Sequence, residues 1–227
     1  TRLGENHYIM TTTTGGAANV MGKLEDYLQT EWPELDVYLT SVTDHFATAT
    51  IGGPNSKKIL NKLIPDLDLS DENFPHMSFK EEKIGKINCR IMRISFTGEL
   101  SYEINIQASY GKSLWEQCMD AGKEFNITPY GTETMHLLRA EKGFIIVGQD
   151  TDGTMTPIDL QMDWVVSKKK YDFIGKRSLY RSDTMREDRK QMVGLLTDDP
   201  NTVLEEGAQI ISELNQTPVQ MLGHVTS

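Results

Sequence analysis

The sequence predicts an α+β fold, in which a small β-sheet packs on helices and a β-rich region follows. Three observations predict it. Short runs with strand-like alternation or β-branched residues recur up to about residue 107. Segments between and after them repeat apolar residues at three- and four-residue spacing, as amphipathic helices do. After Asp150 the pattern changes to turns and short strands, which indicates a different architecture there.

In the first part of the chain, β-branched runs predict strands and apolar spacing predicts helices. The four threonines after Tyr8 form one such run, which Gly15 and Gly16 end. In order, the expected elements are a strand at 7–14, a helix at 17–29, strands at 37–40 and 46–51, and a helix at 56–64.

The clearest local pattern is a β-hairpin over 90–107, with a turn at Thr97-Gly98-Glu99. In its second strand Tyr102 and its alternate neighbours are apolar, so they predict the core face. Glu103 falls on the opposite face, in mid-strand, away from the turns where charge usually lies. It is either a solvated carboxylate or a ligand-binding group in the wall of a cleft.

Two further helices are expected at 111–125 and 132–142, the second ended by Gly143. The order strand, helix, two strands, helix and strand suggests a split βαβ, ferredoxin-like sheet packed on helices. Strands at 191–196, 208–212 and 219–226 then predict a β-rich, barrel-like appendage. We therefore expect two regions, 1–188 and 189–227.

Composition excludes several classes of protein. The 227 residues carry a formal net charge of -10, which argues against a general nucleic-acid binder. Cys89 and Cys118 form no CxxC motif, so they predict reduced core thiols and not a zinc site. The five histidines have no metal-binding spacing. No signal peptide and no membrane-length apolar run is present, so we expect a cytoplasmic protein without membrane contact.

Residues 95–104 read Ser-Phe-Thr-Gly-Glu-Leu-Ser-Tyr-Glu-Ile, and residues 129–143 contain Pro-Tyr-Gly-Thr-Glu-Thr-Met-His-Leu-Leu-Arg. Both resemble signatures of the folate-binding aminomethyltransferase family, which includes the glycine-cleavage T-protein. Shorter matches follow at 148–152, 156–157 and 172–176 in the family's order. The four-threonine run and residues 164–170 resemble the branch formed by alpha subunits of heterotetrameric sarcosine oxidases. Relative to that family, the chain is expected to lack an opening and a closing segment.

The resemblance implies a tetrahydrofolate site built from Glu103, Arg139, Phe96 and Thr13. The two oxygens of Glu103 would accept from the exocyclic amine and ring N–H of the pterin. The planar donor fork of Arg139 suits a carbonyl or carboxylate. Phe96 takes the place of a ring-packing aromatic, and Thr13 stands where T-proteins have Asn.

Plainer roles stay open for these residues. Arg139 is nearly as well explained as an ion-pair partner of Glu133, Glu141 or Glu103 itself, and Phe96 as a core side chain. Val147 lacks the hydroxyl that some T-proteins place there, which puts contacts with the folate tail in doubt.

No catalytic residue is assigned within this chain. The family's transfer step uses an Asp in the opening segment that is expected to be missing. Asp44, Asp150 and Asp152 are alternatives, but Asp150 and Asp152 lie in a Gly-bounded turn and are better explained as turn formers.

The function implied by the resemblance is capture of the one-carbon unit from sarcosine oxidation. Tetrahydrofolate bound here would yield 5,10-methylenetetrahydrofolate, with glycine and hydrogen peroxide as the other products. FAD, FMN and NAD are expected elsewhere in the complex, and the beta, gamma and delta subunits are the expected partners. The fragment alone is expected to be inactive. A stand-alone T-protein and a non-catalytic folate-binding or assembly module are the alternatives.

Residues 168–190 form a basic segment inside an acidic chain. Nine basic and four acidic residues give this segment a net charge of +5, so the remainder carries -15. Such runs are usually solvated faces. A subunit-docking surface is the functional interpretation favoured here, and attraction of a polyglutamylated folate tail is the other.

Overall fold

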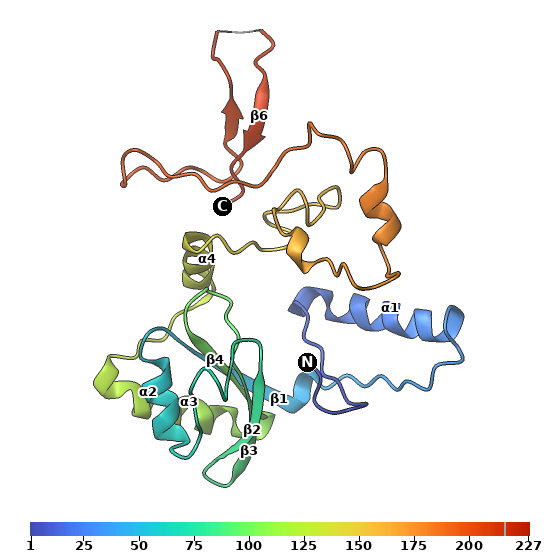
Figure 1. Ribbon diagram of the computed structural model, residues 1–227. Coiled ribbons are helices and arrows are strands. Elements are labelled where there is room, and N and C mark those ends of the chain that lie inside the picture. The colour runs from blue at the N-terminus through green and yellow to red at the C-terminus, as the bar shows by residue number, and fades with distance from the viewer. Residues whose placement is uncertain (216) are drawn as a thin grey trace.

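The computed structural model describes residues 1–215 and 217–227, and its elements mix α-helices with antiparallel sheets (Figure 1). The strands are β1 Phe46–Gly52, β2 Phe79–Ile84, β3 Ile87–Met92, β4 Ser101–Gln107, β5 Gln209–Ile211 and β6 Met221–His224. The α-helices are α1 Ala17–Thr30, α2 Ser56–Leu63, α3 Gly111–Gly122 and α4 Thr132–Glu141. Short 3₁₀ turns lie at Thr14–Gly16, Thr43–His45, Ala108–Tyr110, Lys123–Phe125, Asp163–Val165 and Lys176–Tyr180. The α+β class expected from the sequence is confirmed.

The main sheet has the strand order β1-β4-β3-β2, and every pairing in it is antiparallel. This order differs from the predicted split βαβ arrangement. Two strands, β4 and β3, lie between β1 and β2, so β1 and β2 run in opposite directions. The short connections from β2 to β3 and from β3 to β4 favour pairing of consecutive strands, which explains the meander.

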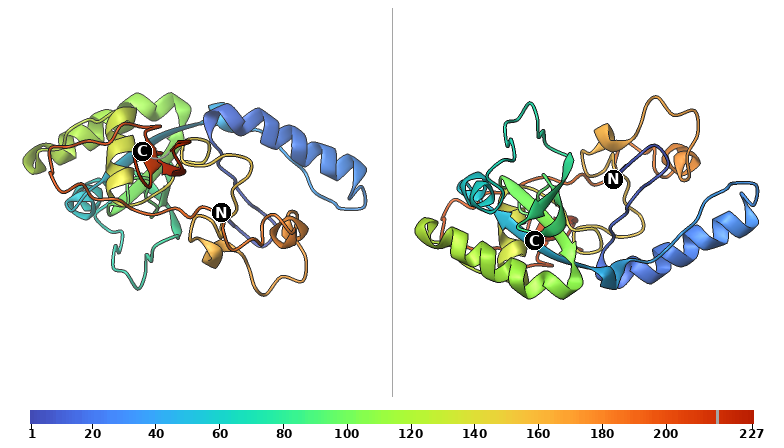
Figure 2. Two further views of the ribbon diagram at one scale, coloured as in Figure 1. Left: turned by 90° about the horizontal axis from the view of Figure 1, so that it is seen from above. Right: turned by 90° about the horizontal axis from the view of Figure 1, so that it is seen from below.

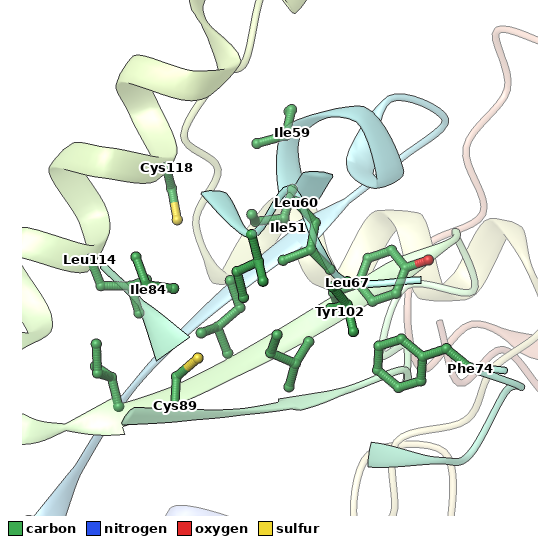
Figure 3. Packing of buried hydrophobic residues seen from close by; sticks show 14 residues of the cluster. Ile51, Ile59, Leu60, Leu67, Phe74, Ile84, Cys89, Tyr102, Leu114 and Cys118 are labelled. Atoms are coloured by element: carbon green, nitrogen blue, oxygen red, sulfur yellow. The ribbon is translucent and has the colours of Figure 1, made fainter. Parts of the chain in front are cut away.

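The hydrophobic core lies between this sheet and helices α2 and α3 (Figure 3). From β4, Tyr102, Ile104 and Ile106 point into it and are fully buried. Leu60 of α2 and Leu114 of α3 pack against them from the helix side. Alternation along β4 therefore directs the odd-numbered residues to the opposite face of the sheet.

Both cysteines belong to this core. Cys89 of β3 and Cys118 of α3 are free and buried, as predicted (Figure 3). Burial raises the pKa of each thiol to about 11. Both groups are therefore neutral, apolar-like fillers of the core at physiological pH.

The N-terminal segment contains a helix but no strand among its described residues. Helix α1 extends away from the sheet in Figures 1 and 2 and has no buried residue. The strands predicted at 7–14 and 37–40 are wrong, apart from an isolated bridge between Arg2 and Tyr8. β-branched residues favour extended backbone, but a strand also needs a partner, and none lies beside these segments.

The C-terminal segment ends in the antiparallel pair β5–β6. Two of the three predicted strands are thus present, whereas 191–196 forms no strand. The proposed boundary at 188/189 falls beside Arg189, whose guanidinium donates to both carboxylate oxygens of Asp159 at 2.8 and 2.7 Å. The backbone N–H of Met192 donates to the Asp159 carbonyl at 2.8 Å. The division into two domains stays a prediction, and these contacts tie the two sides of the boundary together.

Candidate functional site

The face of the main sheet opposite the helices carries two parallel rows of cross-strand neighbours. Register places one residue of each strand in each row. One row is Thr50, Glu103, Met92 and Phe79, and the other is Thr48, Asn105, Arg90 and Glu81. Because cross-strand neighbours lie within about 5.5 Å of one another, each row is a continuous surface.

Glu103 lies in the first of these rows, beside Asn105 of the second, and is half-buried. The side-chain amide of Asn105 donates to Glu103 Oε1 at 3.4 Å, and the Thr48 hydroxyl donates to Asn105 Oδ1 at 2.9 Å. No described residue donates to Glu103 Oε2. The sequence placed Glu103 on this face correctly, and the carboxylate keeps acceptor capacity for a ligand.

Arg90 is a further charged group on this face, and sequence reasoning gave it no role. Its guanidinium donates to Glu81 Oε1 at 2.9 Å and lies 5.8 Å from the centre of the Phe46 ring. Its Nε and Nη1 atoms are buried without a hydrogen-bond partner among the described residues. A cleft of about 900 Å³ is lined by Arg90 and Asn105 from this face and also by Leu63, Ile64 and Cys89 from the helix side of the sheet; Glu103 is not among its lining residues.

The turn of the hairpin contacts the end of helix α4, and this contact brings the two signature segments together. Gly98 has φ +76°, and a Cβ added there would lie 2.7 Å from the side chain of Lys142. Glu99, next in the chain, forms an ion pair with Lys142 at 3.3 Å. Only glycine combines this backbone conformation with so close an approach.

Arg139 of α4 is almost completely buried and is paired with Asp150. Its Nη1 also donates to the Phe144 carbonyl at 3.1 Å, and its Nη2 donates to Ser227 Oγ at 2.7 Å. Nε has no hydrogen-bond partner among the described residues. The fork expected to face a ligand is therefore largely occupied by protein groups, and only the Nε–H and the second N–H of Nη2 remain.

Asp150 is more than the turn former that the sequence suggested. It is 3% exposed and accepts from the Ile146 N–H at 2.7 Å and from Ser227, as well as from Arg139. Burial alone would raise the pKa of this carboxyl, but the hydrogen bonds outweigh it and lower the pKa. Asp152, by contrast, is exposed and accepts from the Thr154 N–H at 2.7 Å, as a turn former does.

The remaining predicted residues lie on exposed backbone segments. Phe96 is 48% exposed in the connection between β3 and β4, so it is not a core side chain. Thr13 is exposed just before the 3₁₀ turn that leads into α1. That end of α1 is the end nearer the sheet in Figures 1 and 2. No hydrogen bond or ion pair joins any two of Glu103, Arg139, Phe96 and Thr13, all of which the structure describes.

The basic segment 168–190 is mostly exposed, but not all of its charges are unpaired. Arg189 pairs with Asp159, and Arg186 pairs with Asp183 and Asp188. The other basic residues form no ion pair with the described residues; they are Lys168, Lys169, Lys170, Lys176, Arg177, Arg181 and Lys190.

Residues 1–170 match the model of the GCVT N-terminal domain, and this match covers more than half of the chain. The chain belongs to the GCVT family. It is 57% identical to the sarcosine oxidase subunit alpha of Corynebacterium sp. (strain P-1) over 93% of this chain and 22% of that protein. It is 33% identical to the mitochondrial dimethylglycine dehydrogenase of Mus musculus over 78% of this chain and 20% of that protein.

A third relative is the aminomethyltransferase of Thermoanaerobacter sp. (strain X514), 34% identical over 64% of this chain and 39% of that protein. The chain thus spans about a fifth of the length of the first relatives it matches. The family resemblance read from residues 95–104 and 129–143 is confirmed. Among the described residues no helix is long and apolar enough to cross a membrane, and no group of His, Cys, Asp and Glu could hold a metal ion.

Proposed function

We propose that this chain is the reduced-folate-binding part of a sarcosine oxidase alpha subunit. The complete enzyme would oxidise sarcosine, and the one-carbon unit would pass to tetrahydrofolate held here. Glycine, hydrogen peroxide and 5,10-methylenetetrahydrofolate are the proposed products. The 57% identity to an alpha subunit supports the choice of the oxidase over a stand-alone aminomethyltransferase, whose example is 34% identical.

The observation that carries the folate proposal is the environment of Glu103. Its half-buried carboxylate lies on the open face of the sheet, with Oε2 unbound by any described residue. A pterin presents two adjacent N–H donors, and a carboxylate accepts from both in a charge-assisted pair. The acceptor capacity of Glu103 thus fits the ligand that the family implies.

The other predicted site residues have smaller roles in the proposed folate site. Phe96 is exposed enough to pack on a ring, and Thr13 offers a hydroxyl near the start of α1. Arg139 would offer only its Nε–H and one N–H of Nη2, because Nη1 binds Asp150 and Phe144 and the other Nη2 N–H binds Ser227. These residues bind and orient the folate, and the chain's contribution to the reaction is proximity.

The proposed setting is a cytoplasmic complex with the beta, gamma and delta subunits, in which FAD, FMN and NAD are bound outside this chain. The unpaired cations of the basic segment 168–190 support a subunit-docking role for that surface.

The folate proposal is tested by Glu103→Gln in the full-length polypeptide. Affinity for 5-formyltetrahydrofolate, measured by calorimetry, should fall by about 1–3 kcal/mol, the worth of a charge-assisted hydrogen-bonded pair. Glu116→Gln is the matched control, since it removes the same charge from an exposed position on α3, the helix on the other face of the sheet. Equal affinities of the wild type and Glu103→Gln would remove Glu103 from the site. Sarcosine-dependent peroxide formation by the reconstituted complex separates the oxidase from a binding module.

A further inference from the structure

The Glu103 carboxylate is held by a chain of two hydrogen bonds that crosses from β4 to β1. Thr48 and Asn105 are cross-strand partners, and the Thr48 hydroxyl donates to Asn105 Oδ1 at 2.9 Å. Asn105 Nδ2 then donates to Glu103 Oε1 at 3.4 Å, two residues back along the same strand face. Thr48, Asn105 and Glu103 thus form a connected relay on the open face.

Each link of the relay fixes the orientation of the next. Asn105 is only 8% exposed, so its amide must find partners within the protein. Because the Thr48 hydroxyl donates to Oδ1, the amide nitrogen is directed away from β1 and toward the glutamate. A carboxylate that accepts one hydrogen bond from a fixed donor loses rotamer freedom before any ligand arrives.

We propose that Asn105, itself oriented by Thr48, is a positioning residue that sets the plane of the Glu103 carboxylate for recognition of an amine edge. This inference rests on the proposed folate function of Glu103 and adds a determinant of selectivity. Each carboxylate oxygen has two acceptor positions, so Oε1 can accept from Asn105 and still face a ligand donor beside Oε2. The relay thereby selects molecules with two adjacent N–H donors over analogues that lack one.

Three substitutions test the relay. Asn105→Leu removes the amide at similar volume, and Thr48→Val removes the hydroxyl at almost the same shape. Thr50→Val is the matched control, because Thr50 is on the same strand and face but its side chain makes no hydrogen bond with the described residues. Each variant is made in the full-length polypeptide, and circular dichroism establishes that it is folded.

The probes are 5-formyltetrahydrofolate and its 2-desamino analogue, which lacks the exocyclic amine. With the wild type, we expect the analogue to bind about ten- to a hundred-fold more weakly. Asn105→Leu should weaken binding of the parent compound about five- to thirty-fold and that of the analogue much less, so the selectivity ratio narrows. Thr48→Val should do the same to a smaller extent, about three- to ten-fold, and Thr50→Val should leave the ratio unchanged.

The outcomes separate the relay from a purely structural role and from failure of the folate proposal. A structural role would weaken both compounds equally and leave the selectivity ratio intact, which would overturn the relay. Thr48→Val should add nothing in the Asn105→Leu background, because the two act in series, and additive effects would also overturn the relay.

If Glu103→Gln itself leaves affinity for the parent compound unchanged, the folate proposal fails. If only Glu103→Gln weakens binding, the relay alone fails. If Asn105→Leu does not fold, the selectivity ratio of Thr48→Val still tests the relay.

Discussion

The ion pair between Arg189 and Asp159 should contribute measurably to local stability in the C-terminal half, and Arg189→Met is the substitution that tests it. Both side chains are largely buried, at 11% and 4% exposure, and two N–H···O contacts of 2.8 and 2.7 Å join them. Asp159 also accepts from the N–H and hydroxyl of Thr156 at 2.8 and 3.0 Å. Removing the guanidinium would leave a buried carboxylate with only these neutral donors.

The expected cost follows from that residual pairing. Breaking a buried ion pair by removing one partner costs about 3–5 kcal/mol when the remaining charge has no other partner. Asp159 keeps two donors from Thr156, so we expect about 2–3 kcal/mol. Arg186→Met is the matched control, since Arg186 is 54% exposed and pairs with still more exposed acids, and such pairs are worth about 0–1 kcal/mol.

Amide hydrogen exchange in the full-length polypeptide measures this loss locally. The N–H groups of Thr156 and Met192 donate to the Asp159 carboxylate and carbonyl, so their protection reports opening of this junction. Arg189→Met should accelerate their exchange about 30- to 150-fold, and Arg186→Met less than about five-fold. Similar acceleration by both variants would refute the distinction between buried and exposed pairs.

The same pair predicts a pH dependence. The hydrogen bonds from Arg189 outweigh burial and lower the pKa of Asp159 from 3.8 to about 2. A carboxyl with a lowered folded-state pKa stabilises the protein above its unfolded pKa and loses that contribution as the pH falls through the folded value. Protection, corrected for the intrinsic pH dependence of exchange, should therefore decline between about pH 4 and pH 2. In Arg189→Met the decline should be smaller, and an unchanged decline would contradict the assignment to this pair.

Two further predictions concern the turn and the core. Gly98→Ala should lower the free energy of unfolding by about 1–3 kcal/mol, because φ is +76° and the new Cβ would lie 2.7 Å from the Lys142 side chain. Gly153→Ala, at a glycine with open space around it, is the control in thermal unfolding, and equal shifts would refute this. Cys89 and Cys118 should react slowly with iodoacetamide at pH 8 in the native protein and readily in urea, because burial raises the pKa of both thiols to about 11. Rapid labelling of the native protein, followed by mass spectrometry, would contradict it.

Helices were predictable from the sequence because their signals are local. Apolar spacing predicted a helix at 17–29, and the structure has α1 at Ala17–Thr30. Similarly, 132–142 corresponds to α4 at Thr132–Glu141. Strands were predicted less well, since 7–14 and 191–196 carry the right residues but have no neighbouring strand. The predicted strand order differs from the observed order for the same reason, because the order of strands in a sheet depends on contacts between segments that are distant in the sequence.

The candidate site shows the same difference between local patterns, which the sequence reveals, and contacts between distant residues, which it does not. Alternation in β4 placed Glu103 and Asn105 on the face opposite the core, and the structure agrees. No local pattern could pair Thr48 with Asn105, which lies 57 residues away. The pairing of Arg139 with Asp150 was missed likewise, because the sequence offered the nearer acids Glu133 and Glu141 as partners.

The contacts around α4 determine how the two signature segments act on each other. Lys142, just after the end of α4, packs on Gly98 and pairs with Glu99, and these two turn residues precede Glu103 on the same hairpin. Arg139, in the last turn of α4, is bound to Asp150 and Ser227. A displacement of α4 would therefore strain a buried ion pair on one side and the hairpin turn on the other. In the proposed folate site we therefore expect Arg139 to act chiefly by fixing α4, and through it the start of the strand that carries the carboxylate.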